Sequence, residues 1–223
     1  MTTKLLIPSK APSLPIAPLE YNKGQQDQHS NVLRLYFTQV DNINAAVLGP
    51  LGGQYFNNPH ISASDSTDQY ADGNNDPTLV KFNTLGTNAG FVLNLDGSAT
   101  CPTSGVYKID YSLQFINTDN AAHDVFVWLQ TNGTVVADSS SRFTIPSRKS
   151  EGVYGYLVAY SSITFPIIGG DNIKLWWATS QAYNPTGPVN GVYMEHIAEQ
   201  TTPYVRPANP SAVGSITFVS SLE

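Results

Sequence analysis

The sequence predicts an all-β fold, an antiparallel jelly-roll sandwich of about 8–10 strands, preceded by an extended N-terminal arm and one short helix. Hydrophobic residues make up 41% of the 223 residues and charged residues only 13%, which provides a core but few charges for helical surfaces. The 17 glycines and 15 prolines supply the turns that many short strands need. From Gly52 onward the sequence either alternates between apolar and polar residues or forms short apolar runs.

Residues 1–30 are expected to form an extended, proline-rich anchoring arm. Four prolines recur at short spacing, at positions 8, 12, 15 and 18, and a polar run follows over residues 22–28. Prolines without helical or strand periodicity favour an extended chain that lies along another surface. A disordered tail is the alternative interpretation.

One short helix is expected over residues 31–50. Ser30 or Asn31 would cap its start, and the Gly49–Pro50 pair would end it. Its apolar residues recur at alternating steps of three and four, as in the seam of a coiled coil. These candidate trimerisation residues are Leu33, Tyr36, Val40, Ile43 and Val47. Because two heptads are marginal alone, the helix must pack against its own β domain or against copies of itself.

Residues 51–223 are expected to form the jelly-roll domain. The clearest strand is Val106–Phe115, whose odd-numbered residues from Tyr107 onward are apolar, while the even-numbered residues from Lys108 to Gln114 are polar. The run 125–129 is apolar on both faces, so a second layer or a subunit interface must cover it. The other expected strands are Thr78–Thr84, Phe91–Leu95, Asp124–Thr131, Val135–Ile145, Val153–Phe165, Asn172–Thr179, Val192–Ile197 and Ala212–Ser220.

Charge and cysteine content argue against several classes of protein. The formal net charge is −6 and no cationic cluster is longer than Arg148–Lys149, which disfavours a nucleic-acid or anionic-membrane surface. A lone Cys101 cannot form an intrachain disulfide. The apolar run before Pro8 is only three residues long, Leu5–Ile7, too short for a signal peptide or a membrane span. We therefore expect synthesis in the cytoplasm, without individual export or membrane insertion.

Three further stretches carry a family resemblance: Gly105–Tyr107, Ile168–Ile173 and Val213–Phe218. They resemble the globular heads of complement and tumour-necrosis-factor-like proteins, in which three jelly rolls pack around an axis through aromatic and aliphatic faces. The resemblance implies a homotrimer. The β domain also carries more aromatic surface than a monomer should leave wet. Its candidate trimerisation residues are Tyr154, Tyr156, Tyr160 and Trp176.

A narrower resemblance concerns tailed phages. The segment Val32–Asn42 is similar to the N-terminal segment of virion structural proteins from phages of cyanobacteria and other aquatic bacteria, and Asp124–Gly133 with Ala137–Ser141 is similar to their jelly-roll domain. This implies a capsid decoration, cement or short-fibre protein on the virion surface, made in the host bacterial cytoplasm. Its partners would be the major capsid protein or tail and fibre components. The arm would contact the particle, and the trimer would clamp neighbouring subunits or present loops to the host.

No enzyme and no cofactor are expected. The four histidines, at positions 29, 60, 123 and 196, have neither metal-ligand nor triad spacing. Carboxylates between residues 65 and 76 suggest a calcium site, with Asp68, Asp72 and Asp76 as weak candidates, but the spacing differs from the helix-loop-helix motif and an ordinary polar loop is the other interpretation.

Two other functions stay open at this point. A carbohydrate-binding module would use exposed tyrosine and tryptophan rings on sugars without any trimer, and a receptor-binding tip on a host-surface glycan would combine both features. A polysaccharide depolymerase is the third alternative, because the sequence does not single out a pair of acidic residues that could catalyse hydrolysis.

Overall fold

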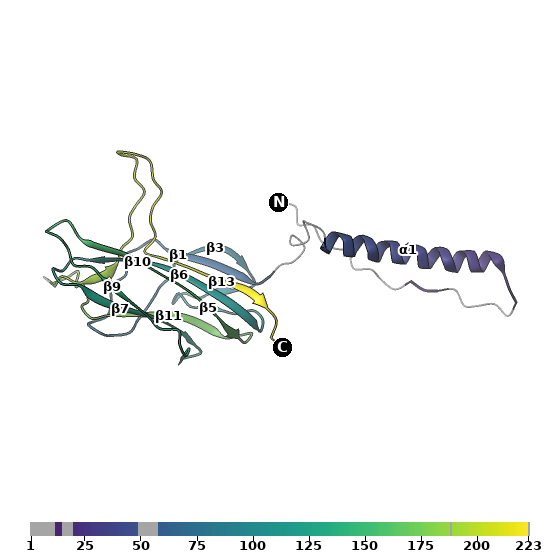
Figure 1. Ribbon diagram of the computed structural model, residues 1–223, viewed down its shortest axis with the longest axis horizontal. Helices are drawn as coiled ribbons and strands as arrows, with labels where there is room; N and C mark the ends of the chain where they lie inside the picture. Colours follow the sequence, from purple (N-terminus) through teal and green to yellow (C-terminus); the bar gives the residue numbers. More distant parts are fainter. Residues whose placement is uncertain (1–11, 15–19, 49–57, 188, 223) are drawn as a thin grey trace. The chain divides into compact units, whose positions relative to one another are not determined.

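The computed structural model describes residues 12–14, 20–48, 58–187 and 189–222. It divides into two units, Met1–Asn57 and Asn58–Glu223. The helix α1 (Lys23–Leu48) belongs to the first unit, and every strand described belongs to the second (Figure 1). No helix in the described ranges is long and apolar enough to cross a membrane.

The helix begins earlier than the sequence predicts. Its first residue is Lys23, and Asn22 caps it by accepting a hydrogen bond from the Gln25 backbone N–H at 3.2 Å. Asparagine is a preferred N-cap residue because its side-chain oxygen satisfies a free N–H of the first turn. The predicted start at residue 31 and the extended conformation of residues 23–30 are therefore wrong. Most of the predicted arm, and the predicted helix end at Gly49–Pro50, lie outside the described residues.

The second unit is an antiparallel sandwich of two sheets. The six-stranded sheet, here sheet A, runs β10-β6-β13-β1-β3, with β12 also paired to β6. The seven-stranded sheet, here sheet B, runs β4-β5-β11-β7-β8, with β2 on β11 and β9 on β7. Sheet A comprises β1 (His60–Asp65), β3 (Thr84–Ala89), β6 (Gly105–Asn117), β10 (Gly155–Ile167), β12 (Val192–Met194) and β13 (Ala212–Ser220). Sheet B comprises β2 (Thr78–Leu79), β4 (Val92–Leu93), β5 (Ala99–Thr100), β7 (His123–Thr131), β8 (Thr134–Val135), β9 (Ser141–Ile145) and β11 (Asn172–Thr179).

The order of the strands gives a jelly roll. From β5 onward the chain crosses repeatedly between the sheets, with β6 and β10 in sheet A and β7, β9 and β11 in sheet B. The two longest strands, β6 and β10, pair over their whole length from Gly105↔Ile167 to Asn117↔Gly155. The predicted all-β sandwich with one helix is confirmed.

The core lies between the two sheets. The odd-numbered residues of β6 from Tyr107 to Phe115 point inward and are buried, as their alternation predicts. Phe115 packs against the fully buried Trp177 of β11, with ring centroids 5.4 Å apart. Phe91 meets Tyr107 edge to face at 5.7 Å. Aromatic packing of this kind adds stability beyond the burial of apolar area.

A charged turn joins β4 to β5. The Asp96 carboxylate accepts hydrogen bonds from the Ser98 N–H and hydroxyl at 3.0 and 2.5 Å, and the Lys174 ammonium lies 3.1 Å from its other oxygen. Gly97 takes the positive φ of 88° that closes the turn. The bonds from Ser98, followed by the bond and charge of Lys174, lower the pKa of Asp96 from 3.8 to about 2.

This lowered pKa predicts a stability change in acid. The ionised carboxylate stabilises the folded state above the unfolded pKa of 3.8, and that contribution is lost as the pH falls towards the folded pKa of about 2. We expect Asp96→Asn to lower the free energy of unfolding at neutral pH and to flatten its decline below pH ~4. Urea titrations across this range measure it. Asp138→Asn, at an exposed turn residue, is the control, and equal acid dependence of the wild type and Asp96→Asn would contradict the prediction.

Candidate functional site

An exposed aromatic and aliphatic row covers part of the outer face of sheet A. Tyr156, Val158 and Tyr160 are 58%, 54% and 58% exposed, and they alternate along β10 with residues that point towards the core. Val213 of β13 lies in the same row of register partners as Tyr160, with Ser112 of β6 between them. We call Tyr156, Val158, Tyr160 and Val213 the sheet A patch. Four neighbouring exposed side chains of this kind form a contiguous apolar patch, which is unusual on the surface of a soluble monomer.

Polar groups border this patch. The Tyr160 hydroxyl donates a hydrogen bond to Asp110 at 3.1 Å, and the Lys108 ammonium lies 3.0 Å from the same carboxylate. Partial burial opposes ionisation of Asp110, but the bonds from Lys108, Ser162 and Tyr160 together hold its pKa below the ordinary value. An apolar centre with a hydrogen-bonded polar border is typical of protein interfaces.

A hairpin projects from the sandwich beside this patch. Between β12 and β13 the chain leaves the body as two antiparallel segments, which bridge at Ile197↔Asn209 and Gln200↔Arg206 (Figure 1). Its tip exposes 66% of Tyr204 and 82% of Val205. The base of the hairpin and the sheet A patch share one hollow of about 150 Å³, lined in part by Ile197, Asn209, Tyr156 and Val158. The hairpin and the patch are therefore neighbouring parts of one surface.

Three tyrosines from distant parts of the chain gather into a cluster. The ring centroids of Tyr70, Tyr183 and Tyr193 lie 4.9 to 5.8 Å apart. The Tyr70 hydroxyl donates to Asp68 at 3.3 Å, and Asp68 also accepts the backbone N–H of His196 at 2.8 Å. Burial and the Asp68 charge raise the pKa of Tyr70, and the same two causes raise the pKa of Glu195.

Tyr70 also lines a groove of about 440 Å³. It runs between the loop that follows β1 and the outer face of sheet B, where Trp176 alternates with the buried Leu175 and Trp177. We call it the Tyr70–Trp176 groove. Its lining residues are Thr67, Asp68, Gln69, Tyr70, Asp72, Thr78, Leu79, Lys81 and Trp176. It brings together Asp68 and Asp72, which the sequence suggested as calcium ligands, and Trp176, which it suggested for trimerisation.

The aspartates suggested as calcium ligands do not form a metal site in the described part of the chain. Among the described residues, no three histidine, cysteine, aspartate or glutamate side chains gather closely enough to hold a metal ion. Asp68 and Asp72 line the groove, whereas Asp76 does not. Asp68 is already bonded to Tyr70 and to the His196 backbone. The three candidate aspartates are therefore not brought together.

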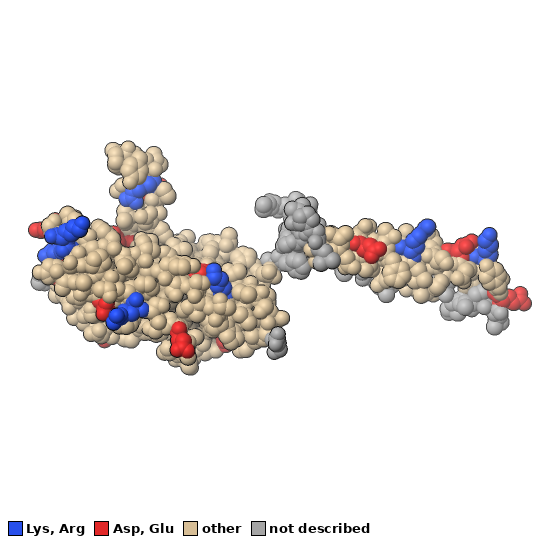
Figure 2. Space-filling model, viewed as in Figure 1, with Lys and Arg blue, Asp and Glu red and all other residues tan. Residues whose placement is uncertain are grey.

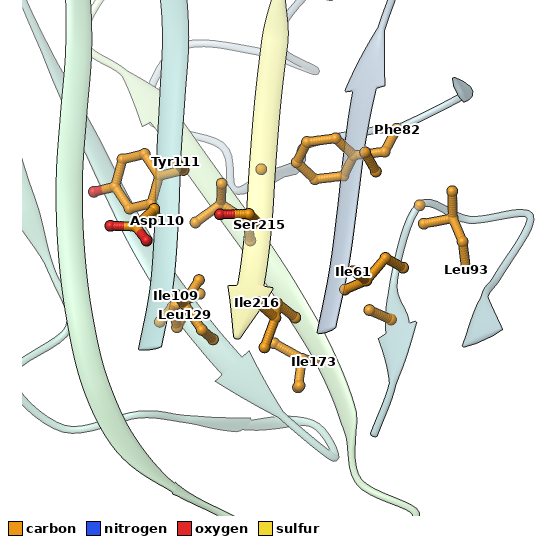
Figure 3. A pocket seen from close by; sticks show the side chains of 15 residues that line it. Ile61, Phe82, Leu93, Ile109, Asp110, Tyr111, Leu129, Ile173, Ser215 and Ile216 are labelled. Atoms are coloured by element: carbon orange, nitrogen blue, oxygen red, sulfur yellow. The ribbon is translucent and has the colours of Figure 1, made fainter. Parts of the chain in front are cut away.

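Another cavity lies inside the sandwich and belongs to the core. It measures about 50 Å³, and apolar residues such as Ile109, Leu129, Ile173 and Ile216 line it (Figure 3). Functional ligand pockets occupy about 300–1,000 Å³. A small apolar cavity stays dry, because a water molecule needs two or more polar partners. We therefore treat it as a packing defect and not as a binding site.

The trimerisation candidates of the β domain do not share one surface. Tyr156 and Tyr160 belong to the sheet A patch, and Tyr154 precedes β10 and is half-buried. Trp176 lies on the outer face of sheet B, where its indole N–H donates to Gln130 at 2.9 Å. The two sets face opposite sides of the sandwich, and a subunit contact through either of them stays a prediction.

The helical candidates form one side of α1. Leu33, Tyr36, Val40, Ile43 and Val47 are all half-buried. Two apolar residues outside the predicted seam, Leu35 and Phe37, are instead more than half exposed. Contact between copies through this helix stays a prediction.

The hairpin tip and the tyrosine cluster were not predicted from the sequence. The signal for the tip was available: Tyr204 and Val205 stand between prolines in a segment without strand periodicity. The cluster gave no local signal, since Tyr70 and Tyr193 are far apart in sequence.

Comparison with known proteins gives no identification. No family model matches the chain, and no curated protein sequence matches it significantly.

Proposed function

We propose that this chain is a non-enzymatic structural protein that forms a homotrimer on the surface of a phage particle, where it decorates or cements the capsid or forms a short fibre. The observation that carries the trimer is the sheet A patch, whose three β10 side chains are each more than half exposed in a single chain. Soluble monomers rarely leave a contiguous apolar surface without a partner, and covering it releases about 25 cal/mol per Å².

The hairpin supplies a second contact surface. In a threefold ring, each copy offers two different surfaces, one to each neighbour. The hairpin projects away from its own body with Tyr204 and Val205 at its tip, so these side chains are free to reach a neighbouring copy (Figure 1). Charged side chains are sparse on the side of the β unit that Figure 2 shows, so few of them oppose close contact there.

The proposed location on a phage particle rests on the similarity of residues 32–42 and 124–133 to phage virion proteins. The separate N-terminal unit would serve as the anchor, with the major capsid protein or a tail component as its partner. Three anchors in one trimer would bind far more tightly than one, because later contacts form within the same complex. Synthesis would take place in the host bacterial cytoplasm.

Removal of residues 1–57 is expected to abolish binding to particles while the β unit stays folded. The β unit has its own continuous core, so the fragment 58–223 should show the far-ultraviolet spectrum of a β-sheet protein and unfold cooperatively. Co-sedimentation with phage particles that lack the protein measures binding, with the full chain as the reference. Undiminished binding of the fragment would show that the anchor lies elsewhere.

A monomeric carbohydrate-binding module is the competing function, and the Tyr70–Trp176 groove is the observation that favours it. The two functions differ in their prediction for the mass in solution, which is one chain for the module and three for the structural protein.

A further inference from the structure

We propose that the Tyr70–Trp176 groove binds a neutral saccharide. The groove combines two aromatic rings with carboxylate, hydroxyl and ammonium groups in one hollow. Its volume of about 440 Å³ lies within the range of about 300–1,000 Å³ that is usual for ligand pockets. This site is distinct from the sheet A patch and does not require the trimer.

Both aromatic rings of the groove are held in place before any ligand arrives. Trp176 is fixed through its indole N–H, which donates to Gln130 at 2.9 Å. Tyr70 is fixed by stacking on Tyr183 at 5.8 Å, by contact with Tyr193 at 5.3 Å and by its bond to Asp68. Rigid rings lose little conformational entropy on binding. The negative face of an aromatic ring attracts the weakly positive C–H groups on one face of a pyranose.

The backbone beneath the groove is equally well fixed. The buried Gln69 side chain accepts the Lys81 N–H at 2.8 Å and donates to the Lys81 carbonyl at 3.0 Å. The Thr78 hydroxyl accepts the Asp72 N–H at 2.8 Å. These bonds tie the loop after β1 to the segment around β2, so the lining residues keep their spacing.

Exposed polar groups at the groove suit the hydroxyls of a sugar. Asp72 is an exposed carboxylate with about four acceptor positions, and Lys81 is an exposed ammonium with three donors. Asp68 is also exposed and offers the acceptor positions that its bonds from Tyr70 and the His196 N–H do not use. Neighbouring hydroxyl groups on a sugar ring both donate and accept hydrogen bonds, so a site that binds them needs acceptors and donors close together. Two carboxylates against one ammonium leave a net negative groove, which disfavours uronates and other acidic sugars. The chemistry therefore selects a neutral saccharide.

The site stays open in the proposed trimer. Trp176 lies on the outer face of sheet B, whereas the sheet A patch lies on the opposite side of the sandwich. Trimer formation through the patch and saccharide binding in the groove can therefore occur together, and they can fail separately.

Saturation-transfer NMR on the full-length protein tests the proposal. The probes are the methyl glycosides of glucose, galactose, mannose and N-acetylglucosamine. Methyl glucuronide, an acidic sugar, and choline, a cation, test the two alternative ligand classes. We expect saturation of the C–H protons on one face of at least one neutral glycoside. Trp176→Ala should weaken its binding by about tenfold or more, and Asp72→Asn by several-fold, because each removes a direct ligand contact.

Phe126→Ala is the matched control, since Phe126 is an exposed aromatic residue on the same sheet but does not line the groove. It should bind the glycoside like the wild type. If Trp176→Ala does not fold, Asp72→Lys replaces it, because Asp72 is exposed and its change places a positive charge in the groove. Binding of methyl glucuronide alone, of choline alone or of no probe would overturn the proposal, as would equal losses in Phe126→Ala and Trp176→Ala. Val158→Glu should keep saccharide binding even where it dissociates the trimer.

Discussion

Replacing Val158 with glutamate is expected to convert the proposed trimer into single chains. Val158 stands between Tyr156 and Tyr160 in the middle of the exposed row on β10, and it is 54% exposed in one chain. A carboxylate buried there would lose its hydration without gaining a cationic partner, at a cost of several kcal/mol per copy. Each 1.4 kcal/mol weakens association about tenfold, so we expect the mass measured by sedimentation equilibrium to fall from three chains to one.

Phe126→Glu is the control for this experiment. It places the same charge at an exposed apolar residue, but on the outer face of sheet B, and it should leave the trimer intact. Circular dichroism of both variants should match the wild type. A trimeric Val158→Glu protein would remove the sheet A patch from the subunit interface.

Replacing Trp177 with alanine is expected to lower the free energy of unfolding of the β unit more than any other substitution proposed here. Trp177 is fully buried, packs against Phe115 and has Thr78 and Val127 as its register partners on either side. Loss of a large buried aromatic side chain costs about 3–5 kcal/mol, because the cavity that remains collapses only in part. For a domain of this size, this corresponds to a decrease in Tm of about 10 °C.

Urea unfolding and calorimetry measure this loss on the β unit, residues 58–223, so that the helical unit does not contribute. The exposed aromatic residue Phe126 provides the comparison, and Phe126→Ala should change the free energy of unfolding by less than about 1 kcal/mol. Equal effects of the two substitutions would contradict the assignment of Trp177 to the core.

Sequence alternation was sufficient to predict the strands that span the core. In β6, apolar residues repeat with period two, and the structure buries that face of the strand. In β10, the first half is apolar on both faces, and the structure leaves Tyr156, Val158 and Tyr160 exposed on the outer one. The strands β1 and β3 went unpredicted because they are built largely from small and polar residues at the far edge of sheet A. The predicted strand Val135–Ile145 is two strands, because Asp138 adopts a φ of 58° that breaks the extended chain.

The helix start shows a related limit. Periodicity of apolar residues marks where a helix packs, and the seam begins at Leu33, so the polar first turns after Asn22 carried no such signal. The same limit applies to the sites. Alternation placed Tyr156 and Tyr160 on one face, but the Tyr70–Trp176 groove depends on contacts between residues far apart in sequence, which one sequence does not reveal.

The most direct test of the account is the mass in solution, by sedimentation equilibrium, of the full chain and of the fragment 58–223. The account predicts three chains in both, because the sheet A patch lies entirely within the fragment. A single chain in both would contradict the trimer and leave the saccharide-binding module as the function. A trimer that is lost in the fragment would contradict the role of the patch and assign assembly to the helix seam.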